Sequence, residues 1–293
     1  MTSIAFIGLG NMGIGMATNL ARSGYDVRGF DLSKDAVAAA VKAGCVKADT
    51  LSDAINNADV VVTMLPAGKH VRGVYGDIFK SAKPGALFID SSTIDIASAR
   101  DVISAAVDKG FAMIDAPVSG GVGGAAAGTL TFMCGGTKPA FDKAKPYLDI
   151  MGKNVFHAGD AGNGQVAKVA NNMLLGIHMI GTCEAFNLAE KLGLDAQTFY
   201  DISSTASGQN WSMTSYCPAP GPVETAPSNR DYKAGFAAAM MLKDMRLAKD
   251  AASTADASIP LGDHAEKLYA AMETAGKDDL DFSGVMKLIQ GTL

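Results

Sequence analysis

The sequence has only four cysteines, and they lie far apart. It contains no C-x-x-C pair, and no histidine stands beside any of the cysteines. Because a zinc site needs closely spaced Cys and His ligands, the sequence predicts no metal centre. We expect reduced, structural thiols at Cys45, Cys134, Cys183 and Cys217.

Basic charge and long apolar runs are also scarce. The 25 Lys and Arg are outnumbered by 30 Asp and Glu, so the chain offers no basic surface for a nucleic-acid backbone. The most apolar long stretch, residues 172–180, falls well short of the roughly 18 residues of a membrane span. The first apolar run begins at Ile4, which leaves no room for a secretory signal. We therefore expect a cytoplasmic protein with no nucleic-acid or membrane partner.

What the sequence does contain is typical of an ordinary globular protein. Hydrophobic residues make up 48% of the chain, with 33 Gly and 10 Pro, a composition that excludes a disordered or collagen-like chain. At roughly 150 residues per domain, a length of 293 predicts two domains with ample material for buried cores.

In the first half, short apolar runs alternate with Ala-rich helical patterns. This repetition predicts a parallel sheet with helices on both faces, and the unbroken apolar runs are typical of strands buried on both sides. The expected strands are Ile4–Ile7, Asp26–Phe30, Val60–Leu65, Ala86–Asp90, Ala112–Asp115, Leu130–Cys134 and Val155–His157.

After Gly164 the strand pattern ends, and the second half is predicted to be helical. A long helix is expected from about Gln165 to Leu192, with Gly193 as its C-cap. The predicted fold is therefore α/β: a Rossmann-type doubly wound sheet at residues 1–162, then an all-α domain at residues 163–293, joined by the long helix. Further helices are expected at Asp195–Ala206, Tyr232–Ala255 and Leu261–Thr274, with a Pro-rich loop at Cys217–Arg230.

The first strand leads into a glycine motif, Gly8-Leu9-Gly10-Asn11-Met12-Gly13, followed by a helical pattern. This is G-x-G-x-x-G in the strand-turn-helix context of a dinucleotide site. Gly8 permits the tight turn, Gly10 lets the backbone approach a pyrophosphate, and Gly13 allows the helix to pack closely. The helix N-terminus offers N–H groups to the anion. The alternative is a Gly-rich turn that binds nothing.

The second strand ends at Asp31, 23 residues after Gly8. That spacing matches the acidic residue that binds the adenosine ribose hydroxyls. Because a 2′-phosphate would meet this carboxylate, with Leu32 where a basic residue would be needed, NAD is favoured over NADP. The alternative is that Asp31 only caps the helix that follows.

A second glycine-rich segment, Asp115–Ala125, follows the fifth expected strand, where open α/β sheets form ligand crevices. Ser119, Gly120 and Gly121 offer a hydroxyl and bare N–H groups to a carboxylate. Composition alone fits a flexible hairpin loop equally well.

Lys168 and Asn172 are four residues apart on the long helix and share one face. A lysine becomes a useful base only where desolvation or a nearby positive group lowers its pKa. By pattern alone, a solvated surface charge is the more usual role for a lysine such as Lys168. Nothing in the pattern singles out Lys243 or decides between a core and a pocket role for Trp211. None of the histidines pairs with a Ser or Cys, so a hydrolase is not supported.

Taken together, four blocks of the chain resemble the β-hydroxyacid dehydrogenase family over nearly its whole length. They are Ile4–Gly13, Asp115–Gly121, Gly164–Asn172 and Leu242–Asp244. Within the family, residues 64–71 and 207–222 resemble the members that act on 3-hydroxyisobutyrate. Neighbouring members act on tartronate semialdehyde, L-serine or L-threonate, so the substrate is less firmly implied than the reaction.

The resemblance implies a role for each predicted site residue. Lys168 would be the catalytic acid/base, with Asn172 orienting a substrate whose carboxylate is held by residues 119–121. Trp211 would be a pocket wall. The resemblance also implies NAD-dependent oxidation of a small β-hydroxyacid, and the helical half, rich in Ala and Met, is expected to form a homo-oligomer, a dimer or tetramer. The implied cofactor-binding residues are Gly8, Gly10, Asn11, Met12, Asp31, Leu65, Pro66, Thr93 and Lys243.

Overall fold

The computed structural model describes residues 2–293 and divides the chain into two compact units, Met1–Lys168 and Val169–Leu293. The division falls inside a single long helix, α8 (Asn163–Lys191), a few residues beyond the expected boundary at residue 162.

The first unit is built on one sheet, which has nine strands within the described residues. Its strand order is β3-β2-β1-β4-β5-β6-β8-β7, with β9 also paired to β8. The run from β3 to β6 is parallel and has the order of a doubly wound dinucleotide fold. The strands are β1 (Ser3–Ile7), β2 (Asp26–Phe30), β3 (Val46–Lys47), β4 (Val60–Thr63), β5 (Leu87–Asp90), β6 (Ala112–Asp115), β7 (Val118–Ser119), β8 (Leu130–Gly135) and β9 (Gly152–Gly159).

The sheet departs from the expected parallel arrangement beyond β6. β8 runs antiparallel to both β6 and β7, whereas β9 is parallel to β8. β7 follows β6 after two residues, and only the ten residues 120–129 connect β7 to β8, fewer than the dozen or more that a parallel crossover needs. The two-residue strands β3 and β7 were not expected, because they are too short to give an apolar run. β2 also differs, since alternate residues of this strand are only partly buried.

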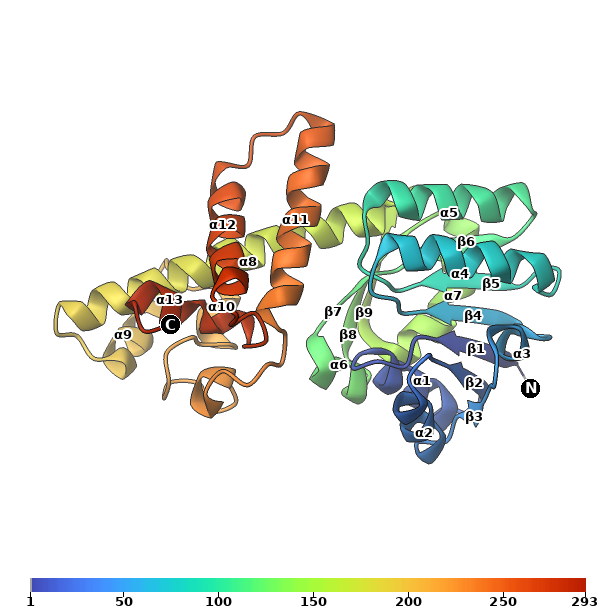
Figure 1. Cartoon of the computed structure of the whole chain (residues 1–293), viewed down its shortest axis with the longest axis horizontal. Helices are drawn as coiled ribbons and strands as arrows, with labels where there is room; N and C mark the ends of the chain where they lie inside the picture. Colours follow the sequence, from blue (N-terminus) through green and yellow to red (C-terminus); the bar gives the residue numbers. More distant parts are fainter. Residues whose placement is uncertain (1) are drawn as a thin grey trace. The chain divides into compact units, whose positions relative to one another are not determined.

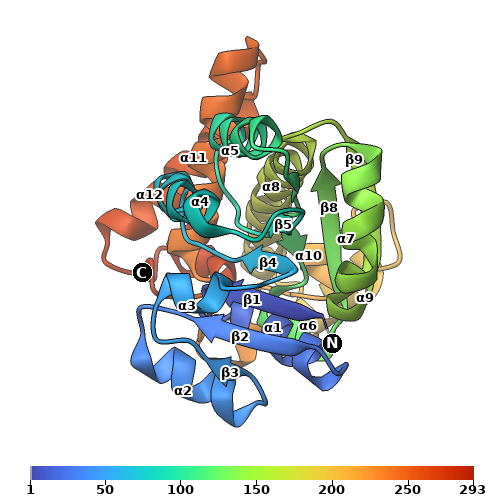
Figure 2. The same ribbon diagram turned by 90° about the vertical axis from the view of Figure 1, so that its right-hand side faces the viewer.

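Helices cover both faces of this sheet (Figures 1 and 2). On one face, Phe6 and Phe132 of the sheet share a buried core with Met16 of α1 and with residues of α7; on the other, Phe88 shares a buried core with Tyr75 of α4 and with residues of α5. α2, α3, α5 and α7 each begin with a side-chain cap that accepts an N–H three residues on. The helices are α1 (Gly13–Arg22), α2 (Lys34–Lys42), α3 (Leu51–Ile55), α4 (Gly68–Ser81), α5 (Ile96–Asp108), α6 (Gly121–Ala127) and α7 (Lys138–Met151).

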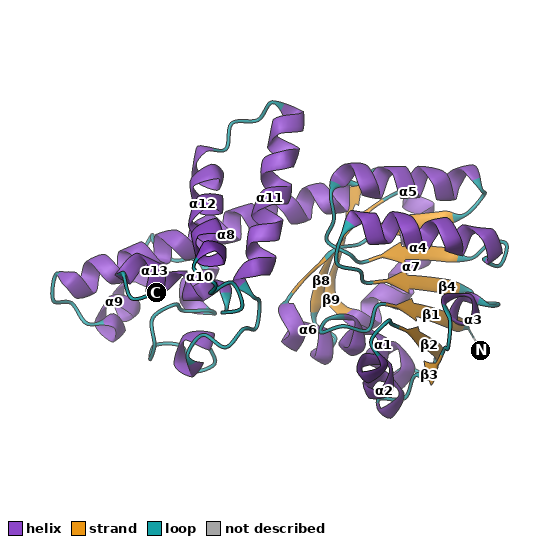
Figure 3. Cartoon of the chain, in the orientation of Figure 1, coloured by secondary structure: helices purple, strands orange, loops and turns teal. Residues whose placement is uncertain are grey.

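The second unit consists of helices and loops, as Figure 3 shows, and its core centres on Phe186, Tyr269 and Phe282. Gly193, with φ +90°, follows the end of α8 as expected. α11 begins at Ala238, later than the expected start at Tyr232. After α8, the second unit contains α9 (Ala196–Ser203), α10 (Trp211–Thr214), η1 (Pro227–Arg230), α11 (Ala238–Ala255), α12 (Pro260–Thr274), η2 (Phe282–Gly284) and α13 (Val285–Gln290).

The later start of α11 has a local cause. Asp231 and Tyr232 have φ values of +49° and +55°, a left-handed conformation that a right-handed helix cannot include. The short helices α10 and α13 were not expected either.

Among residues 2–293, no helix is long and apolar enough to cross a membrane, and no group of His, Cys, Asp or Glu side chains is placed to hold a metal ion. All four cysteines are free and buried.

Candidate active site

The glycine motif forms the turn between β1 and α1, and the surroundings of each glycine explain its presence. Gly8 has φ +96°, and a Cβ there would lie 2.2 Å from the Met64 carbonyl oxygen. A Cβ on Gly13 would lie 1.9 Å from the Gly8 carbonyl oxygen, so this glycine lets α1 pack against the turn. A Cβ on Gly10 would meet nothing within 4 Å. Gly10 thus leaves open the space that a pyrophosphate needs.

The N-terminus of α1 is suited to an anion. In the described part of the chain no side chain caps this helix, and its first turn contains no acidic residue. Its first N–H groups and the positive end of its dipole therefore favour a phosphate. These features of the turn and the helix fit a dinucleotide.

Asp31 follows β2 and is tied to the glycine turn. Its Oδ2 accepts a hydrogen bond of 2.7 Å from Leu9 N, and its Oδ1 accepts one of 2.8 Å from Ser33 N. The cap of α2 is Ser33, whose Oγ accepts from Ala36 N at 3.3 Å, so the alternative that Asp31 only caps this helix is wrong. Its neighbour Leu32 is 93% exposed.

The loops after β4 and β5 contain Leu65, Pro66 and Thr93, and a buried polar network joins the two loops. Leu65 N donates to Ser92 Oγ at 2.8 Å, and Ser92 Oγ donates to Asp90 Oδ1 at 2.6 Å. These loops, the glycine turn and Asp31 all follow the carboxyl ends of parallel strands. The structure therefore gathers these predicted cofactor residues at one edge of the sheet, where such folds bind ligands.

Asp90 lies at the centre of this network and is completely buried. Its Oδ1 also accepts from Thr63 Oγ1 at 2.7 Å, whereas its Oδ2 has no hydrogen-bond partner among the described residues. Burial raises the pKa of the Asp90 carboxyl to about 6, against the lowering effect of its hydrogen bonds to Ser92 and Thr63.

The segment with Ser119, Gly120 and Gly121 forms a short strand and a helix, not a hairpin loop. Ser119 ends β7, Gly120 (φ +132°) is the N-cap of α6, and Gly121 (φ +63°) is its first residue. A Cβ on Gly120 would approach Leu130 to 3.2 Å, whereas one on Gly121 would meet nothing within 4 Å. The Gly121 backbone therefore has open space beside it for a ligand.

Lys168 is 7% exposed, which is contrary to a solvated surface charge. It lies near the start of α8, whose first turn is hydrogen-bonded to Asp115 at the end of β6. Asp115 accepts from Gly162 N at 2.8 Å and from Gln165 N at 2.9 Å. Burial raises the pKa of Asp115, whereas its backbone hydrogen bonds lower it.

In the second unit, Asn172 is 2% exposed and its Nδ2 donates to Asp244 Oδ2 at 2.5 Å. Lys243 Nζ lies 3.3 Å from Asp244 Oδ1, an ion pair without hydrogen-bond geometry. Trp211 is 49% exposed and stacks on Tyr216, with ring centroids 5.2 Å apart.

Sequence reasoning assigned no role to Asp115, Gln165 or Asp244. All three lie inside motifs that it used, but their hydrogen-bond partners are distant in sequence. A polar residue at the end of a buried strand was the one signal that could have pointed to Asp115.

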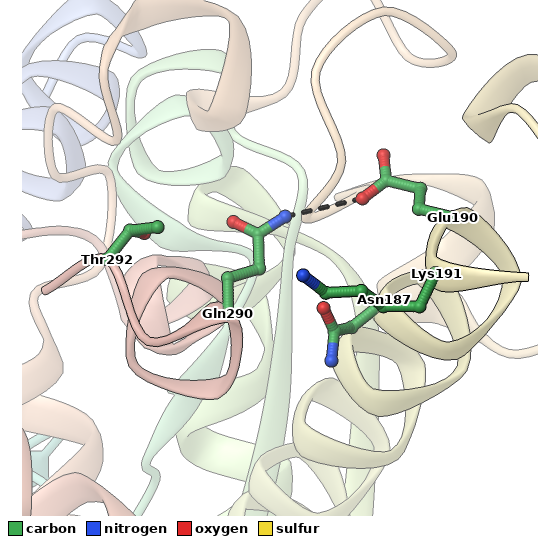
Figure 4. Close-up of a pocket in the computed structure, with 5 residues that line it drawn as sticks. All are labelled: Asn187, Glu190, Lys191, Gln290 and Thr292. Carbon is green, nitrogen blue, oxygen red and sulfur yellow. Dashed lines mark hydrogen bonds between the residues drawn. The ribbon is translucent and has the colours of Figure 1, made fainter. Parts of the chain in front are cut away.

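A separate polar pocket, of about 310 Å³, lies between the C-terminal parts of α8 and α13 (Figure 4). Gln290 Nε2 donates to Glu190 Oε2 across it at 3.3 Å. It shares no residue with the predicted site. The pocket is lined by Asn187, Glu190, Lys191, Gln290 and Thr292.

The doubly wound sheet, the glycine turn and the acid after β2 define a dinucleotide-binding protein. Two family models match the chain accordingly. The NAD-binding domain of 6-phosphogluconate dehydrogenase matches residues 3–159, and the NAD-binding model of NADP-dependent 3-hydroxyisobutyrate dehydrogenase matches residues 162–289. The chain belongs to the β-hydroxyacid dehydrogenase family and is an NAD(P)-dependent oxidoreductase.

Individual relatives match over the full length but differ in substrate. A probable 3-hydroxyisobutyrate dehydrogenase of Mycobacterium bovis is 48% identical over 99% of this chain and 98% of that protein. An NAD-dependent L-serine dehydrogenase of Pseudomonas aeruginosa is 49% identical over 100% of this chain and 99% of that protein. A structure of 3-hydroxyisobutyrate dehydrogenase from Mycobacterium tuberculosis with L-serine has a TM-score of 0.94 at 48% identity, covering 99% of both chains.

Proposed function

We propose that this protein oxidises 3-hydroxyisobutyrate to methylmalonate semialdehyde with NAD, a step of valine breakdown. The observation that carries the reaction type is the burial of Lys168 and Asn172, one helical turn apart on α8. The choice of substrate is supported by the relatives that bear this name and by the resemblance of residues 64–71 and 207–222.

In the proposed reaction, Lys168 Nζ in its neutral form accepts the proton of the substrate hydroxyl. Bound NAD supplies the acceptor, at nicotinamide C4, for the hydride from the carbinol carbon. As the O–H and C–H bonds break, the carbinol becomes an aldehyde and Lys168 holds the proton as an ammonium. The burial of Lys168 keeps bulk water away from this exchange.

The remaining site residues orient the substrate. Ser119 Oγ and the N–H groups of Gly120 and Gly121 hold the carboxylate, which fixes the carbon presented for oxidation. The Asn172 amide is fixed in turn, because its Nδ2 donates to the buried carboxylate of Asp244. Trp211, half exposed, forms a pocket wall.

The proposed preference for NAD rests on Asp31. Its carboxylate accepts hydrogen bonds from the ribose hydroxyls but repels a 2′-phosphate. Its neighbour Leu32 offers no positive charge, and the nearby Arg28 is paired with Asp26 at 3.7 Å.

L-serine is the second candidate substrate, favoured by the serine dehydrogenase at 49% identity and by the serine-bound structure. The two candidates share a carboxylate and a primary alcohol, and differ only in a methyl or an ammonium group on the middle carbon. Specificity therefore depends on whether that group meets an apolar or an anionic surface.

The test is the rate of NAD reduction with 3-hydroxyisobutyrate, L-serine, D-glycerate and L-threonate, each repeated with NADP. We expect the highest kcat/KM with 3-hydroxyisobutyrate and NAD. A higher value with L-serine would overturn the substrate but not the reaction. A higher value with NADP would overturn the role of Asp31.

The same assay tests Lys168 through Lys168→Met. We expect kcat to fall by at least about 100-fold, because proton transfer contributes about 10² to 10⁴, while KM and NADH binding change little. The control is Lys191→Met, at the exposed far end of the same helix. Near-normal kcat in Lys168→Met would refute the catalytic role.

A further inference from the structure

The first turn of α8 is attached to the sheet by two buried polar side chains, Asp115 and Gln165. Each oxygen of Asp115 accepts a backbone N–H, from Gly162 at 2.8 Å and from Gln165 at 2.9 Å. The packing here leaves no slack, since a Cβ on Gly164 would lie 2.7 Å from Asp115 Oδ2 and 2.3 Å from the Met133 carbonyl oxygen. The start of α8 is thus held in one position along the end of β6.

Gln165 makes a second attachment, to the loop after β5. Its side chain is fully buried; Nε2 donates to the Ser92 carbonyl oxygen at 2.7 Å, and Oε1 accepts from Ile94 N at 3.1 Å. These two backbone groups lie on either side of Thr93, a predicted cofactor residue. The Gln165 amide therefore binds the backbone on both sides of Thr93, while its own N–H is bound by Asp115.

Burying a carboxylate and an amide costs desolvation that apolar side chains would avoid. What directional hydrogen bonds add is a fixed position and rotation for the helix they hold. Lys168 lies three residues after Gln165, on the neighbouring part of the same helix face. A rotation of α8 would therefore move its amine relative to Thr93 and to Ser119, which follows Asp115 along the chain.

We propose that Asp115 and Gln165 are positioning residues that hold the amine of Lys168 in a fixed position relative to the loop containing Thr93. The inference rests on the proposed role of Lys168. Both residues act through other groups, and all the residues involved belong to the first unit.

The test is Gln165→Met, which keeps the length of the side chain and removes both of its hydrogen bonds. We expect kcat to fall between about 10-fold and 100-fold, since small misplacements at an active site have effects of this size. KM for the hydroxyacid should stay within about threefold of the original value. Amide hydrogen exchange should become faster at residues 92–94 and 162–168, a readout independent of turnover. The matched control is Gln197→Met, an exposed glutamine of α9.

A kcat within about twofold of the unchanged enzyme, or unchanged hydrogen exchange, would overturn the proposal. So would a loss of kcat matched by an equal loss of NADH-binding sites, because that shows only unfolded protein. If Gln165→Met does not fold, the same outcomes are applied to Gln165→Glu, which keeps the acceptor for Ile94 N.

Lys168→Met, assayed in parallel, separates this proposal from the proposed function. Full turnover in Lys168→Met means that the proposed catalytic role has failed. Loss of turnover in Lys168→Met with normal turnover in Gln165→Met means that only the positioning role has failed.

Discussion

Asp90 is a completely buried carboxyl group whose hydrogen bonds are concentrated on one oxygen, and its folded-state pKa of about 6 is well above the usual value near 3.9. Between about pH 4 and pH 6 the folded protein keeps a proton that the unfolded chain has released. The free energy of unfolding therefore falls as the pH rises through this window.

Asp90→Asn should remove this pH dependence, because an amide can still accept from Thr63 and Ser92 but carries no charge. Relative to the unchanged protein, its free energy of unfolding should rise by up to about 3 kcal/mol between pH 4 and pH 7. Denaturant unfolding at several pH values measures this difference. Asp142→Asn, at an exposed position of α7, is the control; a pH-independent difference for Asp90→Asn would contradict the prediction.

At the level of single residues, sequence reasoning succeeded where a role depends on local spacing. The position of Asp31 after β2 follows from its distance to Gly8, and its bond to Leu9 N agrees with that placement. The contacts of Gln165 with the Ser92 loop, and of Asp244 with Asn172, join residues more than 70 positions apart. No local pattern encodes such pairs.

At the level of elements, the turn between β1 and α1 contains two glycines with different roles: one is needed for stability and the other for ligand binding. Gly13→Ala places a Cβ 1.9 Å from a backbone oxygen, whereas Gly10→Ala places one in open space. We expect Gly13→Ala to cost about 1 to 3 kcal/mol of stability through overpacking. Gly10→Ala should leave stability unchanged and weaken NADH binding at least about tenfold, because its methyl group occupies the pyrophosphate space.

Thermal unfolding and NADH fluorescence titration distinguish the two effects. Gly76→Ala in α4, where a Cβ also meets nothing within 4 Å, is the control for an added methyl away from the site. Unchanged NADH affinity in Gly10→Ala would place the dinucleotide elsewhere.

Elements were predicted well where they are long and regular. The helical pattern from residue 165 to residue 192 predicted α8, and the short apolar runs predicted β1, β4 and β5. β3 and β7 consist of two residues each and exist through pairing with neighbouring strands. α11 begins later than predicted because Asp231 and Tyr232 have a left-handed backbone conformation. That conformation is set by the loop that precedes α11 and not by helix propensity.

At the level of the whole molecule, the alternation of strands and helices followed by helices alone was enough to predict the fold class. The direction of β8 was not predictable in this way, because it depends on a connection too short for a crossover. A homo-oligomer stays a prediction. It is supported by large apolar side chains exposed near the end of α8 and in α9, with Leu188 61%, Leu192 78% and Ile202 56% exposed.

Sedimentation measurements should give a mass that is a whole-number multiple of 30.1 kDa, two or four by expectation. Leu192→Lys should shift the distribution toward the single chain, because a charge in an apolar interface is costly. Leu32→Lys, at an exposed leucine of the first unit, is the control. A single 30.1 kDa species at every concentration would contradict the prediction.

The four buried cysteines have a practical consequence. Burial raises the pKa of Cys45 and Cys217 to about 11 and that of Cys134 to about 12, and raises the pKa of Cys183 as well. Since the thiolate is the reactive form, none of these side chains should compete for an alkylating dye at neutral pH. One cysteine introduced on the surface of each unit would thus accept a fluorophore on the otherwise natural chain, and energy transfer between the two dyes would report whether the distance between the units changes during turnover.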